Sequence, residues 1–216
     1  MGARSAEIRL AAACGIVGPL LLVAYFVAPA VLGWPYAGAS PATLTRYALD
    51  HSVLFYAGAW LQATGTLLSV IFFLALLRFA GAIGSLSGLA LMVTATSLLA
   101  VVLVEASLLV AVPMAATAAD TATVSTTFAL SNGPFVRVFP LAPSSATYVA
   151  LGLVLLGSAV LARPFAYAAL ALGAAFEVIG VAAIFSSAAL IVLAVLAAVQ
   201  ALWILAAAIG LWRWAR

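Results

Sequence analysis

The chain has 216 residues, of which 68% are hydrophobic and only 6% are charged, with a formal net charge of +3. Soluble domains carry about 25% charged residues, so this composition excludes a soluble globular fold. The remaining class is an all-α polytopic membrane protein, whose apolar exterior is solvated by the lipid bilayer. No stretch places basic residues beside stacking aromatic residues, which argues against a nucleic-acid partner.

Six stretches of the chain are long and apolar enough to cross a bilayer, which takes about 20 residues of helix. The first follows Arg4 and Arg9 and is longer than the apolar core of a signal peptide, so we expect it to be a retained helix. We predict one domain, residues 1–216, built as a transmembrane bundle of six helices. These cover residues 10–32, 53–77, 86–112, 146–162, 166–185 and 189–211.

The first substantial outer loop is predicted over residues 33–52. Ser40 followed by Pro41 is typical of an N-cap and the first turn of a helix. We therefore expect a short helix on the outer surface, and we expect Asp50 or Ser52 to cap the membrane helix that follows.

The second outer loop is predicted over residues 113–145. Its first half is small and polar, and its second half, FALSNGPFVRVFPLAP, is apolar with a turn at residues 132–134. We expect this apolar half to lie on, or dip into, the mouth of the bundle. It is either a lid or a loop packed on the helix tops.

The arginines indicate the orientation. With a cytoplasmic N-terminus, six of the eight arginines lie on the cytoplasmic side, and only Arg46 and Arg137 lie outside. We therefore predict that both termini are cytoplasmic and that the protein is a multi-pass protein of the plasma (inner) membrane. The absence of lysine, with abundant Ala, Val, Leu and Gly, is typical of a GC-rich bacterial genome.

Four polar residues, Gln62, Glu105, Glu177 and Gln200, lie deep inside predicted helices. Helix rise places all four about 10–17 Å below the outer boundary, in one layer. Gln62 and Glu177 each belong to a stripe of small and polar residues at helical spacing. Small residues let helices approach closely, so these faces are predicted to point into the bundle.

A charged carboxylate at this depth costs about 2.5–3.5 kcal/mol on insertion scales, and no arginine lies in the same layer. We therefore expect Glu105 and Glu177 to be largely protonated. Two interpretations remain open. The four residues form either a closed hydrogen-bonded layer that fixes helix register, or the lining of a cavity that binds a polar or cationic solute or passes protons.

Asp50, His51 and Arg137 are predicted at the outer rim. They could form an entry site or respond to external pH, but capping and surface ion pairing are the favoured interpretation. His51 and Cys14 are the only histidine and cysteine, so no paired metal motif is present, and we expect neither a metal nor a cofactor.

The whole chain resembles small six-span bacterial membrane proteins of uncharacterised function. The resemblance rests on GAWLQATGTLLSVIFFLALLR in the second predicted helix, on the acid in the third, and on SNGPFVRVFPLAP in the second outer loop. It implies a membrane location and no particular activity.

Two functions compete. The first is a small transporter or a solute- or proton-binding protein that uses the acid and amide layer. The alternative is an accessory or sensory membrane subunit whose polar layer is structural and which meets a membrane protein partner or a second copy of itself. An enzyme is least expected, because the chain has no recognisable metal, serine–histidine or paired-aspartate motif.

Overall fold

The computed structural model describes residues 3–33, 35, 39–131, 133, 136–139, 143–186 and 188–214. This part of the chain is all-α and contains no strand. Its helices are α1 (Ala3–Leu32), α2 (Pro41–Asp50), α3 (Ser52–Phe79), α4 (Leu86–Thr117), α5 (Thr121–Leu130), α6 (Val136–Phe139), α7 (Ser145–Leu156), α8 (Arg163–Phe185) and α9 (Ala188–Trp214).

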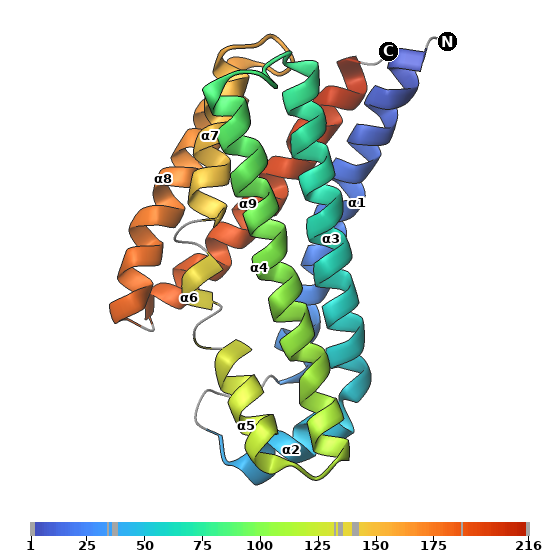
Figure 1. Ribbon diagram of the computed structural model, residues 1–216, viewed down its shortest axis with the longest axis vertical. Coiled ribbons are helices and arrows are strands. Elements are labelled where there is room, and N and C mark those ends of the chain that lie inside the picture. Colours follow the sequence, from blue (N-terminus) through green and yellow to red (C-terminus); the bar gives the residue numbers. More distant parts are fainter. Residues whose placement is uncertain are drawn as a thin grey trace.

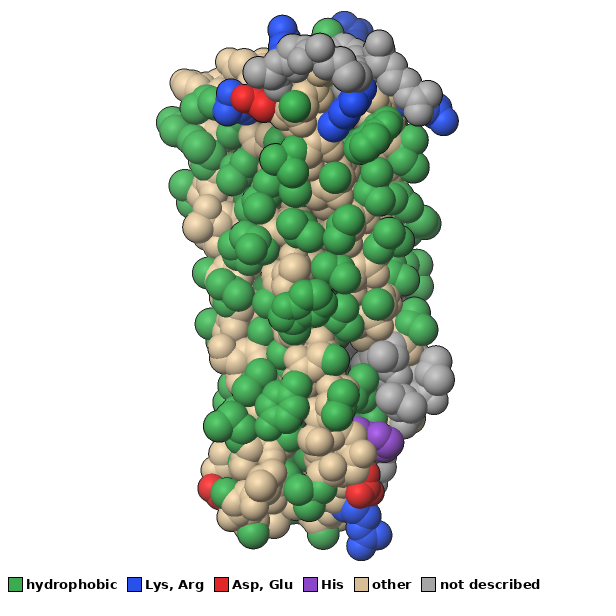
Figure 2. All heavy atoms as spheres, turned by 90° about the vertical axis from the view of Figure 1, so that its right-hand side faces the viewer, with side chains coloured by type: hydrophobic (Ala, Val, Ile, Leu, Met, Phe, Trp, Pro, Cys, Tyr) green, Lys and Arg blue, Asp and Glu red, His purple; other side chains and the backbone are tan. Residues whose placement is uncertain are grey.

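Among the described residues, five helices are long and apolar enough to cross a membrane, namely those of α1, α3, α4, α8 and α9. On the face that Figure 2 shows, hydrophobic side chains cover the middle of the molecule, and charged side chains lie near its two ends. Such a belt is stable only in lipid. The chain is therefore an integral, multi-pass membrane protein.

Six helices form a closed ring. The neighbouring pairs α1–α3, α3–α4, α4–α7, α7–α8 and α8–α9 all pack together, and α9 packs back on α1. The two chain ends lie at the same end of the bundle, and α2 and α5 lie together at the opposite end (Figure 1). At the end that holds the termini, Arg78 of α3 and Glu7 of α1 form an ion pair of 3.1 Å.

The fourth predicted span is much shorter than expected. In place of a helix over residues 146–162, α7 has 12 residues and ends at Leu156, so it rises only about 18 Å against a hydrocarbon core of about 30 Å. The predicted loop over residues 113–145 is largely helical, since α4 continues to Thr117 and is followed by α5 and α6. The sequence before α7 contains Pro134, Pro140 and Pro143, and proline cannot donate the backbone hydrogen bond of a helix.

Two hydrophobic clusters hold the ring together. The inner cluster joins α1, α3, α4, α7, α8 and α9 on the side of the chain termini. The outer cluster joins α2, α3, α4 and α5 at the opposite end. On α3, buried Gln62, Thr66 and Ser69 lie between Ala59 of the outer cluster and Val70 of the inner cluster. The bundle therefore has a polar level between two apolar ones.

The short surface helix predicted after Ser40 is confirmed as α2. The Ser40 hydroxyl accepts a hydrogen bond from the Thr43 backbone N–H at 3.2 Å, which satisfies one of the free N–H groups at the helix start. The expected cap on the next helix is wrong. His51, which ends α2, is the residue before α3, and its side chain makes no capping bond.

Close packing of α1 on α3 depends on two glycines. A Cβ atom on Gly65 would lie 2.8 Å from the Gly18 carbonyl oxygen, and a Cβ on Gly18 would lie 2.8 Å from the Gly65 carbonyl oxygen. Both distances are too short for real atoms, so the two backbones approach each other because neither residue has a side chain.

We predict that Gly65→Ala destabilises the protein by about 1–3 kcal/mol, the usual cost of overpacking, although alanine favours the helix by about 1 kcal/mol. Gly84→Ala is the matched control, because a Cβ there meets nothing within 4 Å. The measurement is the thermal unfolding midpoint in detergent. Equal midpoints for the two variants would show that the crossing is not tight.

Candidate functional site

A cavity of about 570 Å³ lies inside the ring of helices. Side chains from α1, α3, α4, α8 and α9 line it, together with Ser131 after α5 and Phe139 of α6. Most of the lining is apolar. Its polar members are Tyr25, Gln62, Thr66, Ser69, Glu105, Ser131 and Gln200. The volume falls within the range of about 300–1,000 Å³ that is typical of small-molecule sites.

Three of the four residues predicted to share a layer line this one cavity. Gln62 comes from α3, Glu105 from α4 and Gln200 from α9. Their exposed fractions are 4%, 2% and 8%. The predicted stripe on α3 is confirmed, because Gly58, Gln62, Gly65, Thr66 and Ser69 are all buried.

Each of the three side chains carries an unsatisfied oxygen. Gln62 Oε1, Glu105 Oε2 and Gln200 Oε1 have no hydrogen-bond partner within the described part of the chain. A buried polar atom left unpaired costs about 1–3 kcal/mol. These residues therefore do not satisfy one another as a closed layer would, and together they place three unpaired oxygens around one cavity. The two amide oxygens accept hydrogen bonds, and Glu105 Oε2 accepts one when the carboxyl group is ionised.

The other oxygen of Glu105 is held by the segment that follows α5. The Ser131 hydroxyl, which is 4% exposed, donates to Glu105 Oε1 at 2.5 Å. The sequence predicts this segment at the mouth of the bundle but indicates no role for Ser131. Its one signal was a polar SNG turn inside an apolar stretch.

Two tyrosines that the sequence analysis left unassigned flank the site. Tyr25 of α1 lies close enough to Glu105 for the two groups to interact electrostatically. The Tyr25 ring also packs over Gly58, where an added Cβ would lie 3.3 Å from the ring. The Tyr148 hydroxyl of α7 lies beside Gln200 without meeting hydrogen-bond geometry. Tyr25 and Tyr148 therefore place two further polar groups next to the carboxyl and amide groups.

Glu177 does not belong to the buried layer. Its side chain is exposed on α8, so the prediction that it points into the bundle is wrong. Gly173 packs against α7, where its Cβ would lie 2.8 Å from the Ser145 carbonyl oxygen. Phe176, which is 1% exposed, takes the inward position next to Glu177.

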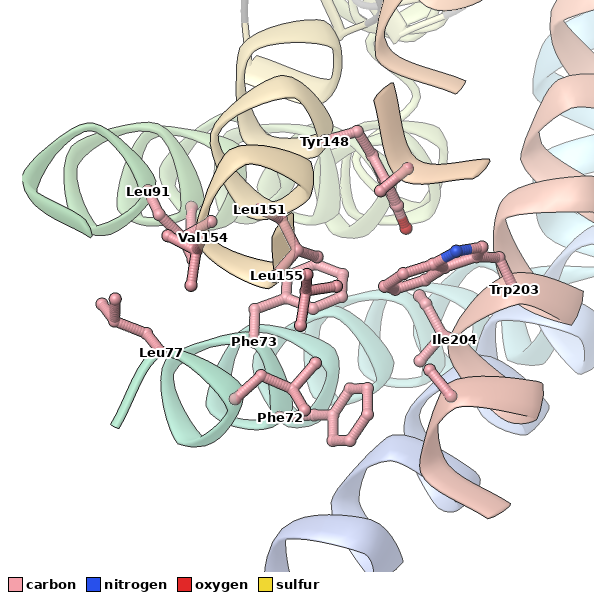
Figure 3. Close-up of a cluster of buried hydrophobic side chains, with 14 of the residues drawn as sticks. Phe72, Phe73, Leu77, Leu91, Tyr148, Leu151, Val154, Leu155, Trp203 and Ile204 are labelled. Carbon is pink, nitrogen blue, oxygen red and sulfur yellow. The ribbon is translucent and has the colours of Figure 1, made fainter. Parts of the chain in front are cut away.

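Large side chains close the cavity toward the chain termini. Phe73, Tyr148 and Trp203 converge from α3, α7 and α9, with Ile204 beside them (Figure 3). The ring centroids lie 5.7 Å apart for Phe73 and Tyr148 and 5.6 Å apart for Tyr148 and Trp203, both edge to face. This geometry is the favourable one for aromatic pairs, and it leaves the inner half of the bundle packed.

Among the described residues between α5 and α7, Ser131 and Phe139 cover the cavity on the opposite side. The Phe139 ring of α6 stands edge-on to Phe176, at 6.4 Å between centroids. Arg137 fastens α6 in place, because its Nε donates to the Ala183 carbonyl of α8 at 3.1 Å and its Nη1 to the Gly133 carbonyl at 3.0 Å. This cover matches the expectation that the apolar half of the loop dips into the mouth of the bundle.

The predicted rim residues are separate rather than clustered. The His51 ring packs against Tyr47 at 4.4 Å, and Asp50 is exposed at the end of α2. Arg137 donates to the backbone carbonyls of Ala183 in α8 and of Gly133 before α6. These contacts agree with the favoured interpretation that the rim residues have structural roles. Within the described ranges, no group of three or more His, Cys, Asp or Glu side chains could hold a metal ion.

Comparisons with protein-family models, with curated proteins and with solved structures found no match. The resemblance to small six-span bacterial membrane proteins therefore stays a prediction, and the function has to be argued from the cavity itself.

We predict that Ser131→Ala destabilises the protein by about 1–3 kcal/mol, because it leaves both Glu105 oxygens without a donor. Ser125→Ala is the control, since the Ser125 hydroxyl bonds only the Thr121 carbonyl one turn earlier in α5. Thermal unfolding and proteolysis of the segment after α5 report the effect. Identical behaviour of the two variants would remove Ser131 from the site.

A second prediction concerns Asp120, which caps α5. The Thr123 hydroxyl, at 2.6 Å, and the Thr123 backbone N–H, at 3.0 Å, both donate to its carboxylate and hold the pKa of Asp120 below its ordinary value. The ionised Asp120 carboxylate therefore stabilises the folded protein fully above the pKa of Asp120 in the unfolded chain, near pH 4. This stabilisation is lost as the pH falls through the lower pKa of Asp120 in the folded protein.

Asp120→Asn keeps a good N-cap but cannot titrate. Between about pH 6 and about pH 3, the unfolding midpoint of the natural protein should fall further than that of Asp120→Asn. Because the other acids titrate in both proteins, the difference isolates Asp120. Parallel curves would contradict its role.

Proposed function

We propose that this integral membrane protein is a small transporter or solute-binding protein of a bacterial plasma membrane. Its cavity holds a polar or cationic molecule that donates hydrogen bonds to Gln62, Glu105 and Gln200. The observation that carries the proposal is the set of three buried acceptor oxygens around one cavity. Transfer of a proton to Glu105 is part of the same proposal, since membrane-embedded acids are typical of proton pathways in transporters.

We also propose six crossings of the bilayer, with both termini in the cytoplasm. In this topology the path from α5 through α6 to the end of α7 makes one crossing as a broken helix. Non-helical backbone at membrane depth is tolerated where it is buried in protein or lines a cavity, and interrupted helices are common at transporter binding sites. Arg4, Arg78 and Arg163, at the end that holds the termini, support a cytoplasmic location for that end.

A catalytic role is not part of the proposal. The histidine, His51, belongs to the junction of α2 and α3 at the outer end, whereas Glu105 and the two glutamines line the cavity. A binding role uses the groups that are present at the cavity without requiring a nucleophile.

The test replaces an unpaired acceptor with an apolar side chain of similar size. We predict that Gln62→Leu raises the unfolding midpoint of the protein without added compound, because it removes an unsatisfied buried oxygen worth about 1–3 kcal/mol. The same variant should lose the stabilisation that primary alkylammonium ions and alcohols give the natural protein. Thermal shift across short and long members of both series measures the two effects.

Thr96→Val is the control, because Thr96 is exposed on α4 and its hydroxyl bonds the Met92 carbonyl of its own helix. It should leave the response to the compounds unchanged. A lower midpoint for Gln62→Leu, with no compound stabilising the natural protein, would instead support a structural polar layer.

An accessory subunit is the second candidate, and Glu177 favours it. A carboxyl group exposed on a membrane-spanning helix is costly in lipid and usually faces protein. A partner helix or a second copy of the chain would cover it. Co-purification of a partner that is lost in Glu177→Leu but kept in Gln62→Leu would support this role.

A further inference from the structure

The cavity has a side opening between α1 and α9. Within the described part of the chain, five lining residues are exposed on the outside of the bundle, and all five are apolar. They are Val23, Phe26 and Val27 of α1 and Ala194 and Ala198 of α9. We call these five residues the lateral mouth.

The crossing of α1 and α9 explains why the mouth lies at this level. A Cβ on Gly15 of α1 would lie 2.8 Å from the Ala208 side chain of α9, so the two helices touch closely there. Toward the other end α9 leaves α1 and runs to the end of α8 (Figure 1). The gap therefore widens from Gly15 toward Val23 and Ala198.

The lateral mouth faces hydrocarbon rather than water. Its residues fall inside the apolar spans Arg4–Val27 and Val192–Arg213, at the ends of those spans that lie away from the chain termini. In the proposed orientation this is the outer leaflet. Because the mouth carries no polar side chain, a hydrated ion would have to shed its water to pass through it.

Described side chains also lie toward the two aqueous sides of the cavity. Phe73 and Ile204, both 0% exposed, line it toward the end that holds the termini. On the opposite side, Ser131 bonds Glu105, and Arg137 bonds the Ala183 carbonyl of α8. The lateral mouth therefore offers an apolar route from lipid to the three unpaired oxygens.

We propose that the cavity takes a single-chain amphiphile from the outer leaflet through the lateral mouth. Its head carries N–H or O–H donors that bond Gln62 Oε1, Glu105 Oε2 and Gln200 Oε1. Its tail lies against the apolar lining and extends through the mouth into lipid. This inference rests on the proposed function and adds the ligand class and the route. A cavity of about 570 Å³ suits one chain with a small head.

The experiment compares radiolabelled dodecylammonium with butylammonium on the purified protein in phosphatidylcholine nanodiscs. Each buried methylene adds about threefold to fourfold in affinity, so the dodecyl compound should bind at least about tenfold more tightly. Gln62→Leu should abolish the saturable part of this binding, which separates the site from simple partition into lipid.

The route is tested with Ala194→Trp, which places a large side chain in the lateral mouth. Val195→Trp is the matched control, because Val195 is exposed on the same helix but does not line the cavity. We expect Ala194→Trp to slow entry of dodecylammonium at least about tenfold and Val195→Trp to leave it unchanged. Ala198→Phe serves the same purpose if Ala194→Trp does not fold.

Two outcomes overturn the inference, and they are distinguishable. If butylammonium binds as tightly as dodecylammonium in a Gln62-dependent way, the lateral route is wrong and the binding function stands. The same holds if the folded mouth variant, Ala194→Trp or Ala198→Phe, takes up dodecylammonium at the rate of the natural protein. If no compound binds in a Gln62-dependent way, the binding function itself is wrong, and this inference fails with it.

Discussion

The constraint on which this structure depends is that a polar atom inside a membrane must find its partner within the protein. Most of the chain satisfies it with helical backbone bonds and with hydroxyl groups that bond their own helix, such as Ser69 to the Gly65 carbonyl at 2.8 Å. Gln62, Glu105 and Gln200 each keep one side-chain oxygen without a partner in the described part of the chain. The surrounding fold holds three acceptors in place without pairing them, which a structure selected for stability alone would avoid.

The packing around the polar level explains how this level is maintained inside the bundle. At the polar level itself, the glycine crossing holds α1 close to α3, and toward the termini the aromatic group around Tyr148 fills the core. At the other end, α2 and α5 pack against α3 and α4 in the outer cluster. Between these layers α9 diverges from α1 (Figure 1), and α7 is a helix of only 12 residues. The cavity is thus a consequence of helix geometry.

The sequence predicts the parts that depend on local pattern. The stripe around Gln62 repeats at helical spacing, so its inward direction follows from α3 alone, and the Ser40–Pro41 pair identifies α2. The same logic fails at Glu177, because Gly173 marks a close helix contact without showing which neighbouring position on α8 is covered. Phe176 and α7 decide that, and both are tertiary features.

The short α7 could not be predicted for a related reason. Hydropathy favours a continuous span after residue 145, whereas α7 ends at Leu156. The bond from Ser131 to Glu105 joins residues 26 positions apart, and only the path of the whole segment brings them together. Periodicity carries no information on such a contact.

The most direct test of the central claim is an electron cryomicroscopy structure of the protein in lipid nanodiscs at side-chain resolution. The account predicts non-protein density in the cavity within hydrogen-bond distance of Gln62, Glu105 and Gln200, and continuous with the gap between α1 and α9. A closed interior in which these three side chains bond one another would contradict it.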